Sequence, residues 1–260
     1  MSATLPLLRV RSREIIRTWR LWVLPIVALF FAATGPVITR FTKDILLAAL
    51  GSAEGGAAAL SIPDPTALTS YARWTSDLSQ LIVFIVVIMA AGAINSEVRS
   101  GVASLMLVKP VSRTAYVLTH AVAQFVFVAL TVLLATLVNW GITAAIWTDA
   151  PLEPILAAAG VWIVLAAVLI AASLLASAIF DATAAAAGIG IGLYFALALL
   201  GMLPWLVSYT PVGLLSLSAG VAAGTQAADH ALWWPLATGV LLAALLLAIT
   251  VRVFQRKELR

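Results

Sequence analysis

The sequence predicts an all-α polytopic membrane protein with about six transmembrane helices, in a single domain that covers residues 1–260. Apolar residues make up 63% of the chain and charged residues only 10%, and the mean hydropathy is +1.10. A soluble domain carries about a quarter charged residues, because water must solvate its surface. The long apolar runs and the uneven distribution of basic residues both favour the bilayer as this chain's solvent.

A transmembrane helix needs roughly 20 mostly apolar residues to cross a hydrocarbon core of ~30 Å. Six runs rich in Leu, Ala, Val and Ile meet this requirement. They are residues 21–39, 79–95, 116–140, 155–180, 183–203 and 232–251.

The basic residues predict the orientation of these spans, because cytoplasmic loops of membrane proteins are enriched in Lys and Arg. With a cytoplasmic N-terminus, twelve of the fifteen basic residues fall on the inner side. The outer side keeps only Arg40, Lys43 and Arg73. Six spans with both termini cytoplasmic follow from this count. We expect the membrane to be the cytoplasmic membrane of a prokaryote.

The segment before the first span, residues 5–20, has the periodicity of an amphipathic helix. Apolar side chains and Trp19 share one face, and basic side chains share the adjoining one. We expect this helix to lie along the inner membrane interface; the alternative, which is compatible with it, is that the arginines only set the topology. The residues concerned are Arg9, Arg13, Arg17, Trp19 and Arg20.

Two long outer segments separate the spans. Residues 40–78 contain a possible short helix at 42–50, and residues 204–231 contain an apolar helix at 212–222. The weak polarity of the second segment suggests a hairpin that is re-entrant or lies at the interface rather than a solvated loop. Its tryptophan and tyrosine side chains fit an outer aromatic belt.

The inner segment between spans two and three, residues 96–113, has its own pattern. Its first dozen residues could form a short amphipathic helix with Val98, Val102 and Leu105 on one face. Pro110 ends that helix, and Ser112 can cap the next one. From the residues alone, an element that docks a soluble partner and an ordinary connecting loop are both open.

The sequence offers no constellation of catalytic or cofactor-binding residues. It has no GxxxxGK[ST] loop for a nucleotide and no cysteine. His120 and His230 fall on opposite sides of the predicted membrane, so they cannot share a metal. No carboxylate is expected near the middle of a span, since Asp77 is placed near an outer end. We therefore expect no enzyme activity, no cofactor and no metal in this chain, and energy for transport would have to come from a partner.

The segment 96–113 resembles the corresponding segment of the permease subunits of ABC-2 type exporters. The resemblance rests on the order Glu97-x3-Gly101-x3-Leu105-x-Leu107-x2-Pro110-x-Ser112-Arg113-x2-Tyr116. Val102 and His120 stand where the family often has Thr and Lys. In that family the segment is a coupling helix that contacts the ATPase. The resemblance implies that Glu97, Gly101, Pro110 and Arg113 shape the element and that Val98, Val102 and Leu105 pack it.

The same resemblance implies a function and partners. The chain would be the transmembrane permease subunit of an ABC exporter for a hydrophobic or amphipathic substrate. ATP and Mg²⁺ would be bound by a separate ABC ATPase subunit in two copies, and a second permease copy or a paralogue would complete the pathway in the lipid bilayer, with no nucleic acid involved. The alternatives are an ATP-independent secondary transporter or channel and a non-transporting membrane scaffold.

Overall fold

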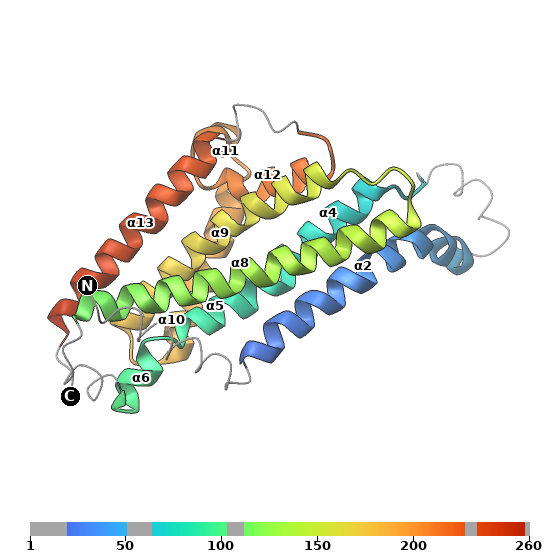
Figure 1. Cartoon of the computed structure of the whole chain (residues 1–260). Coiled ribbons are helices and arrows are strands. Elements are labelled where there is room, and N and C mark those ends of the chain that lie inside the picture. Colours follow the sequence, from blue (N-terminus) through green and yellow to red (C-terminus); the bar gives the residue numbers. More distant parts are fainter. Residues whose placement is uncertain (1–19, 51–63, 103–111, 227–232, 258–260) are drawn as a thin grey trace.

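A computed structural model describes residues 20–50, 64–102, 112–226 and 233–257 of the chain (Figure 1). This described part contains helices and connecting turns and no β-strand. Six of its helical segments are long and apolar enough to cross a membrane. The prediction of an all-helical protein with six helical segments that could span a membrane is confirmed for the described residues.

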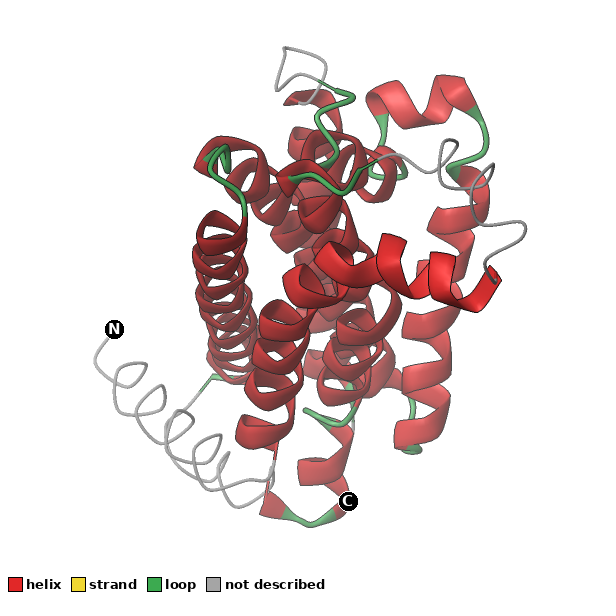
Figure 2. Cartoon of the chain, turned by 90° about the vertical axis from the view of Figure 1, so that its right-hand side faces the viewer, coloured by secondary structure: helices red, strands yellow, loops and turns green. Residues whose placement is uncertain are grey.

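The first span is α2 (Arg20–Leu50), which is longer than the predicted 21–39. The short helix predicted at 42–50 is the last part of α2 and not a separate element. Pro25 and Pro36 lie inside this helix, and a proline removes one backbone hydrogen bond and favours a bend. Figures 1 and 2 show that α2 changes direction in its second half, which runs across the end of the bundle.

The second span begins at Ala67 and not at Ser79, so the prediction of a loop up to residue 78 is wrong. It consists of α4 (Ala67–Asp77), the π-helical turn η1 (Leu78–Ile82) and α5 (Val83–Ala91), followed by the short helix α6 (Asn95–Arg99). Thr66 and Thr69 form a reciprocal capping box that starts α4. The polar residues of α4 made it look like a loop, but several of them face the interior of the bundle.

The short helix predicted over the first dozen residues of 96–113 is interrupted. Helix α6 ends at Arg99, and Gly101 has a φ of 73°. This left-handed conformation suits glycine, because it has no Cβ. Residues 103–111, with Leu105 and Pro110, lie outside the described part.

The remaining spans are α8 (Arg113–Ile146), α9 (Leu152–Ile179), α10 (Thr183–Leu200) and α13 (Trp233–Arg256). They agree with the predicted runs, except that α8 and α13 extend several residues further. Ser112 caps α8, as predicted: its hydroxyl accepts a hydrogen bond of 3.1 Å from the Ala115 amide.

Between α10 and α13, the structure contains α11 (Pro204–Tyr209) and α12 (Gly213–Ala222). The predicted apolar helix at 212–222 is therefore confirmed. A Cβ on Gly213 would overlap the Val207 carbonyl, so the turn between the two helices needs glycine. Trp205, Tyr209 and Trp233 are all more than 60% exposed at this end of the bundle, in keeping with the aromatic belt that the sequence predicts.

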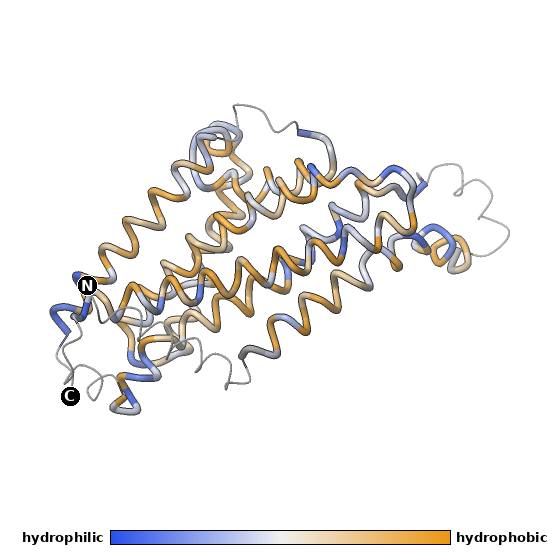
Figure 3. Tube along the Cα trace, viewed as in Figure 1, coloured by the Kyte–Doolittle hydropathy of each residue, from blue (hydrophilic) through white to orange (hydrophobic). Residues whose placement is uncertain are grey.

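Helix α9 is the centre of the bundle and packs against α5, α8, α10, α12 and α13. The start of α2, α6, the start of α8 and the end of α13 lie together at one end of the bundle, which we call the α6 end (Figure 1). Hydrophilic residues gather mostly at the two ends, and the helix middles are hydrophobic (Figure 3). The predicted interfacial helix, with Arg9, Arg13, Arg17 and Trp19, lies outside the described residues, and α2 begins at Arg20.

Candidate functional site

The predicted coupling segment lies at the α6 end, where the described part of that segment contacts α8. The Tyr116 hydroxyl donates a hydrogen bond of 2.6 Å to Oε2 of Glu97. Nε2 of His120 lies 3.4 Å from the same oxygen, and the His120 side chain is only 7% exposed. Tyr116 and His120 are one helical turn apart on α8, so both reach one carboxylate. Glu97 therefore fastens α6 to the first two turns of α8.

Arg113, one residue after the cap of α8, contacts the end of α13. Its Nη1 atom donates to the backbone carbonyls of Phe254, Gln255 and Lys257 at 3.1, 2.9 and 2.8 Å. The last carbonyls of a helix have no partner within the helix and carry partial negative charge. The Arg113 guanidinium donates hydrogen bonds to these carbonyls, and its positive charge compensates their partial negative charge. The Tyr116 ring, stacked on Phe254 at a centroid distance of 5.2 Å, strengthens the same contact.

Lys257, just after α13, connects this helix to the end of α9. Its ammonium donates to the Ala178 carbonyl and to Oδ1 of Asp181, both at 3.0 Å. Asp181 is exposed, so this ion pair contributes little stability. The bond to the buried end of α9 fixes where the chain leaves α13.

Ser177 of α9 connects that helix to the start of α6. Its hydroxyl accepts hydrogen bonds from the amides of Ile94 and Asn95, at 3.1 and 3.0 Å, where the chain leaves α5. Thr183, the first residue of α10, donates to Oδ1 of Asn95 at 3.1 Å. These bonds satisfy buried polar groups that would otherwise be costly. They also join α6, α9 and α10.

Together these contacts form a ring that runs from α6 to α8, α13, α9 and back to α6, which we call the end ring. A displacement of α6 would act on three other helices through it, and on α10 through the bond between Thr183 and Asn95. Exposed Arg99, Arg252 and Arg256 make the α6 end basic.

Of the residues predicted for the coupling element, the structure brings Glu97 and Arg113 into the end ring. Val98 packs against the main hydrophobic core of the chain. Val102 is half-buried and Gly101 provides the turn. Leu105 and Pro110 lie outside the described residues, as do Arg9, Arg13, Arg17 and Trp19, and the Arg20 side chain is not described.

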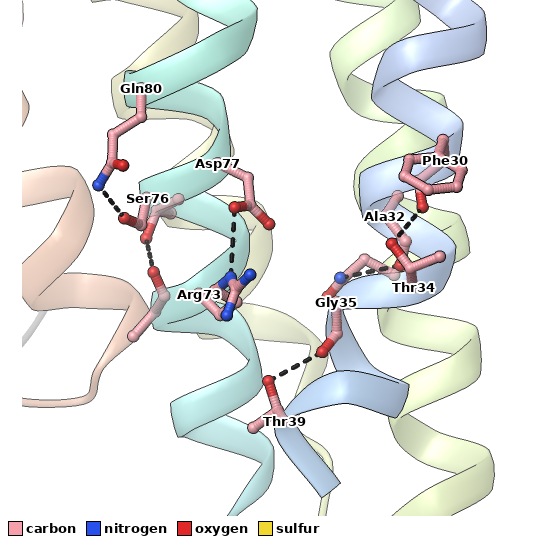
Figure 4. A network of polar contacts seen from close by, with 12 residues as sticks. Phe30, Ala32, Thr34, Gly35, Thr39, Arg73, Ser76, Asp77 and Gln80 are labelled. Carbon is pink, nitrogen blue, oxygen red and sulfur yellow. Dashed lines mark hydrogen bonds and ion pairs between the residues drawn. The ribbon is translucent and has the colours of Figure 1, made fainter. Parts of the chain in front are cut away.

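A second polar group, which the sequence analysis missed, lies where α2, α4 and α8 meet (Figure 4). Nε of Arg73 donates to Oδ1 of Asp77 at 3.3 Å. The Asp77 side chain is 10% exposed and the Arg73 side chain 43%. Asp77 thus belongs to a span and faces the interior, whereas the sequence placed it near an outer end.

Asn139 of α8 replaces a backbone hydrogen bond that α2 lacks at its bend. Its Nδ2 atom donates to the Ala32 carbonyl at 3.0 Å. In a regular helix the amide of residue 36 would donate to this carbonyl, but residue 36 is proline and has no N–H. Asn139 is fully buried, so its amide group supplies the bond that Pro36 removes.

The spacing of polar residues along α8 could have revealed this polar group from the sequence. Thr136, Asn139 and Thr143 recur at intervals of three and four residues, on one face of the helix, and all three are fully buried. Thr136 accepts a hydrogen bond from the Trp74 indole at 3.0 Å, and Thr143 contacts Ser70 at 3.1 Å. A polar stripe in an apolar span indicates a face that meets other helices.

A charged contact also joins the second half of α2 to the segment before α4, but the Asp64 side chain is 86% exposed, so the pair contributes little stability. Lys43 donates to Oδ1 of Asp64, which precedes α4, at 2.7 Å. The Lys43 ammonium holds the pKa of the Asp64 carboxyl below its usual value. This pair lies at the opposite end from α6.

The described residues contain no group of three or more His, Cys, Asp or Glu side chains that could hold a metal ion. Six apolar spans, with α9 at their centre and polar contacts at their ends, define a polytopic helical membrane protein. The chain belongs to the family described as "Protein of unknown function (DUF2705)", whose family model matches residues 57–260. No curated protein matches the chain.

Proposed function

We propose that this protein is the transmembrane permease subunit of an ATP-driven exporter of the ABC-2 type. A separate ATPase would bind ATP and Mg²⁺ and dock on the segment 96–113. The proposal is supported chiefly by the end ring, because it links α6, the described part of that segment, to α8, α9, α10 and α13. The resemblance of this segment to the coupling helix of that class supports the same conclusion.

Motion would be transmitted from the ATPase to the spans through α6. A push on α6 would move α8 through Glu97 and Tyr116, because the carboxylate is held at 2.6 Å. It would move α9 through the bonds that Ser177 accepts from Ile94 and Asn95. The bundle would then tilt as a nearly rigid unit, and two such units could enclose a pathway for a hydrophobic or amphipathic substrate.

The partners follow from the same proposal. Two permease copies, or this chain and a paralogue, would each bind one ATPase at a cytoplasmic α6 end. The small-residue run of α10 serves packing within the chain on one face, where Ala186 contacts Ala91 and Ala176. Gly188 and Gly192 lie on its exposed face, with open space around them, and this face is our proposed contact with the second copy.

The test is co-purification with an ATPase that is encoded beside this gene and contains a phosphate-binding loop. We expect the pair to purify together from detergent and to separate when exposed Arg99 is changed to Glu, or when residues 98–107 are deleted. Arg99→Glu is the sharper variant, because Arg99 lies on α6 and is exposed, whereas Glu97→Arg also breaks the contact with Tyr116.

The matched control is Asp64→Arg, a charge reversal of an exposed residue at the opposite end. It should leave the complex intact. A complex that survives both Arg99→Glu and the deletion would contradict the docking proposal. Uptake driven by an ion gradient without ATP would support the secondary transporter in its place.

A further inference from the structure

Two buried side chains from different helices, each with one acceptor oxygen that has no partner, lie beside Gly35 of α2. Oδ2 of Asp77 (α4) and Oδ1 of Asn139 (α8) accept no hydrogen bond from any described residue. The Asp77 side chain is 10% exposed and Asn139 is fully buried. Buried polar atoms normally have a partner, and leaving one without a partner is costly.

Both side chains face the same glycine. A Cβ built on Gly35 would lie 3.8 Å from Oδ2 of Asp77 and 3.7 Å from Nδ2 of Asn139, and it would meet no other atom within 4 Å. The Asn139 amide cannot simply turn over, because its nitrogen is held by the Ala32 carbonyl. In Figure 4, Asp77 points from its helix toward the side on which Gly35 lies.

The charged groups near Asp77 compensate its Oδ1 atom but not its Oδ2 atom. On α4, Arg73 contacts Oδ1 and is 43% exposed. On α8, the titratable residues are Arg113, Tyr116 and His120, all at the α6 end. On α2, the charged residues whose side chains are described, Arg40, Lys43 and Asp44, come after the bend at Pro36. An ionisable group inside a span faces a partner or serves a function, and here both oxygens need a positive charge or a donor.

We propose that Asp77 and Asn139 form a binding site for a small monovalent cation, either a proton or an alkali metal ion such as Na⁺. A proton on Oδ2 of Asp77 would be donated toward Oδ1 of Asn139. A metal ion would be bound by the same two oxygens. This inference goes beyond the transport proposal and does not depend on an ATPase.

The position of the site gives it a mechanical consequence. It bridges α4 and α8 beside Gly35, the residue before the Pro36 bend of α2. A cation there would hold the two oxygens together and narrow the space next to the bend. Occupancy would therefore limit the movement of the second half of α2.

The experiment measures the thermal midpoint of the purified full chain in lipid nanodiscs. Sodium chloride is compared with choline chloride at one ionic strength, and the pH is varied between about 5 and 8. A ligand that binds only the folded state raises the midpoint. We expect the wild type to gain several degrees in sodium, or to show a pH profile that Asp77→Asn lacks. The control Asp64→Asn removes an exposed carboxylate and should behave as the wild type.

Gly35→Ala distinguishes the two cations. The added methyl group makes ordinary contacts of 3.7 and 3.8 Å, so it should fold while occupying the space of a metal ion. Loss of the sodium effect in this variant assigns the site to a metal ion, and a retained pH effect assigns it to a proton.

The proposal is overturned if the wild type has the same midpoint in sodium and choline and its pH profile superimposes on that of Asp77→Asn. It is also overturned if Asp77→Asn leaves either effect unchanged. If Asp77→Asn fails to fold, two direct measurements on the wild type test the proposal in its place. The absence of both bound ²²Na⁺ and an infrared band of a protonated carboxyl group in the wild type would then overturn the proposal.

Discussion

Gly190 of α10 lies at a close contact between helices that leaves no room for a side chain. A Cβ there would overlap Oγ of Ser173 on α9 and lie 2.6 Å from a methyl group of Val87 on α5. Gly188 and Gly192, two residues away on either side, have nothing within 4 Å. Three glycines of one run thus have two different physical roles.

This difference predicts the effect of alanine at the three positions. Gly190→Ala should destabilise the protein by about 1–3 kcal/mol, as overpacking of a helix contact does. For the folding of the single chain, apart from its contact with a second copy, Gly188→Ala and Gly192→Ala should be neutral or stabilising by up to about 1 kcal/mol, because alanine favours the helix. Thermal unfolding in detergent measures all three, and equal effects at the three positions would contradict the packing of α10 on α9.

Asn139 of α8 compensates for the backbone hydrogen bond that Pro36 of α2 cannot make. Asn139→Ala should cost roughly 1 kcal/mol, near the average and upper values for hydrogen bonds between membrane helices (~0.6 and ~1.7 kcal/mol). In a Pro36→Ala background the restored N–H can donate to the Ala32 carbonyl, so the cost of Asn139→Ala should fall. A double-mutant cycle of unfolding free energies measures this coupling.

The control for this cycle is Pro25→Ala, which changes the other proline of α2. Asn139→Ala should retain its full cost in that background, because the carbonyl that Asn139 contacts is that of Ala32. Equal costs in all backgrounds would mean that Asn139 does not compensate for Pro36.

At the scale of elements, Arg113 of α8 donates hydrogen bonds to the carbonyl groups at the end of α13. Arg113→Ala should leave the carbonyls of Phe254, Gln255 and Lys257 without this donor and increase fraying of the last turn. Amide hydrogen exchange over residues 252–256 should become faster, while exchange in the middle of α13 stays unchanged. Arg99→Ala, which removes an exposed arginine of α6, is the matched control, and faster exchange in both variants would count against the capping role.

The second span shows what the residues could and could not reveal about elements. Residues 79–95 are apolar and are correctly predicted as a span, but Ala67–Asp77 was taken for a loop because of its Ser, Thr, Arg and Asp residues. In the structure Ser70, Trp74 and Thr75 are buried, and Ser70 and Trp74 are hydrogen-bonded to α8. Hydropathy averages a window and cannot recognise polar groups that another helix satisfies.

At the scale of the whole molecule, the topology can be tested directly because the chain has no cysteine. Single cysteines at exposed Ser100, beside α6, and at exposed Ser208, on α11, should react with a membrane-impermeant reagent from opposite sides of the membrane. Ser100→Cys should require access from the cytoplasm, and Ser208→Cys should react in intact cells. Labelling of both from one side would contradict the six-span arrangement.

The sequence by itself determined that the chain is helical and has six segments that could span a membrane, because a bilayer requires long apolar runs whatever their neighbours are. It also singled out Glu97 and Arg113, since a local motif contains them. Only the tertiary structure decided that Glu97 contacts Tyr116 and His120, that Arg113 holds the end of α13, and that Asp77 and Asn139 face Gly35. These contacts join residues from different helices, and their pairing depends on how the helices pack.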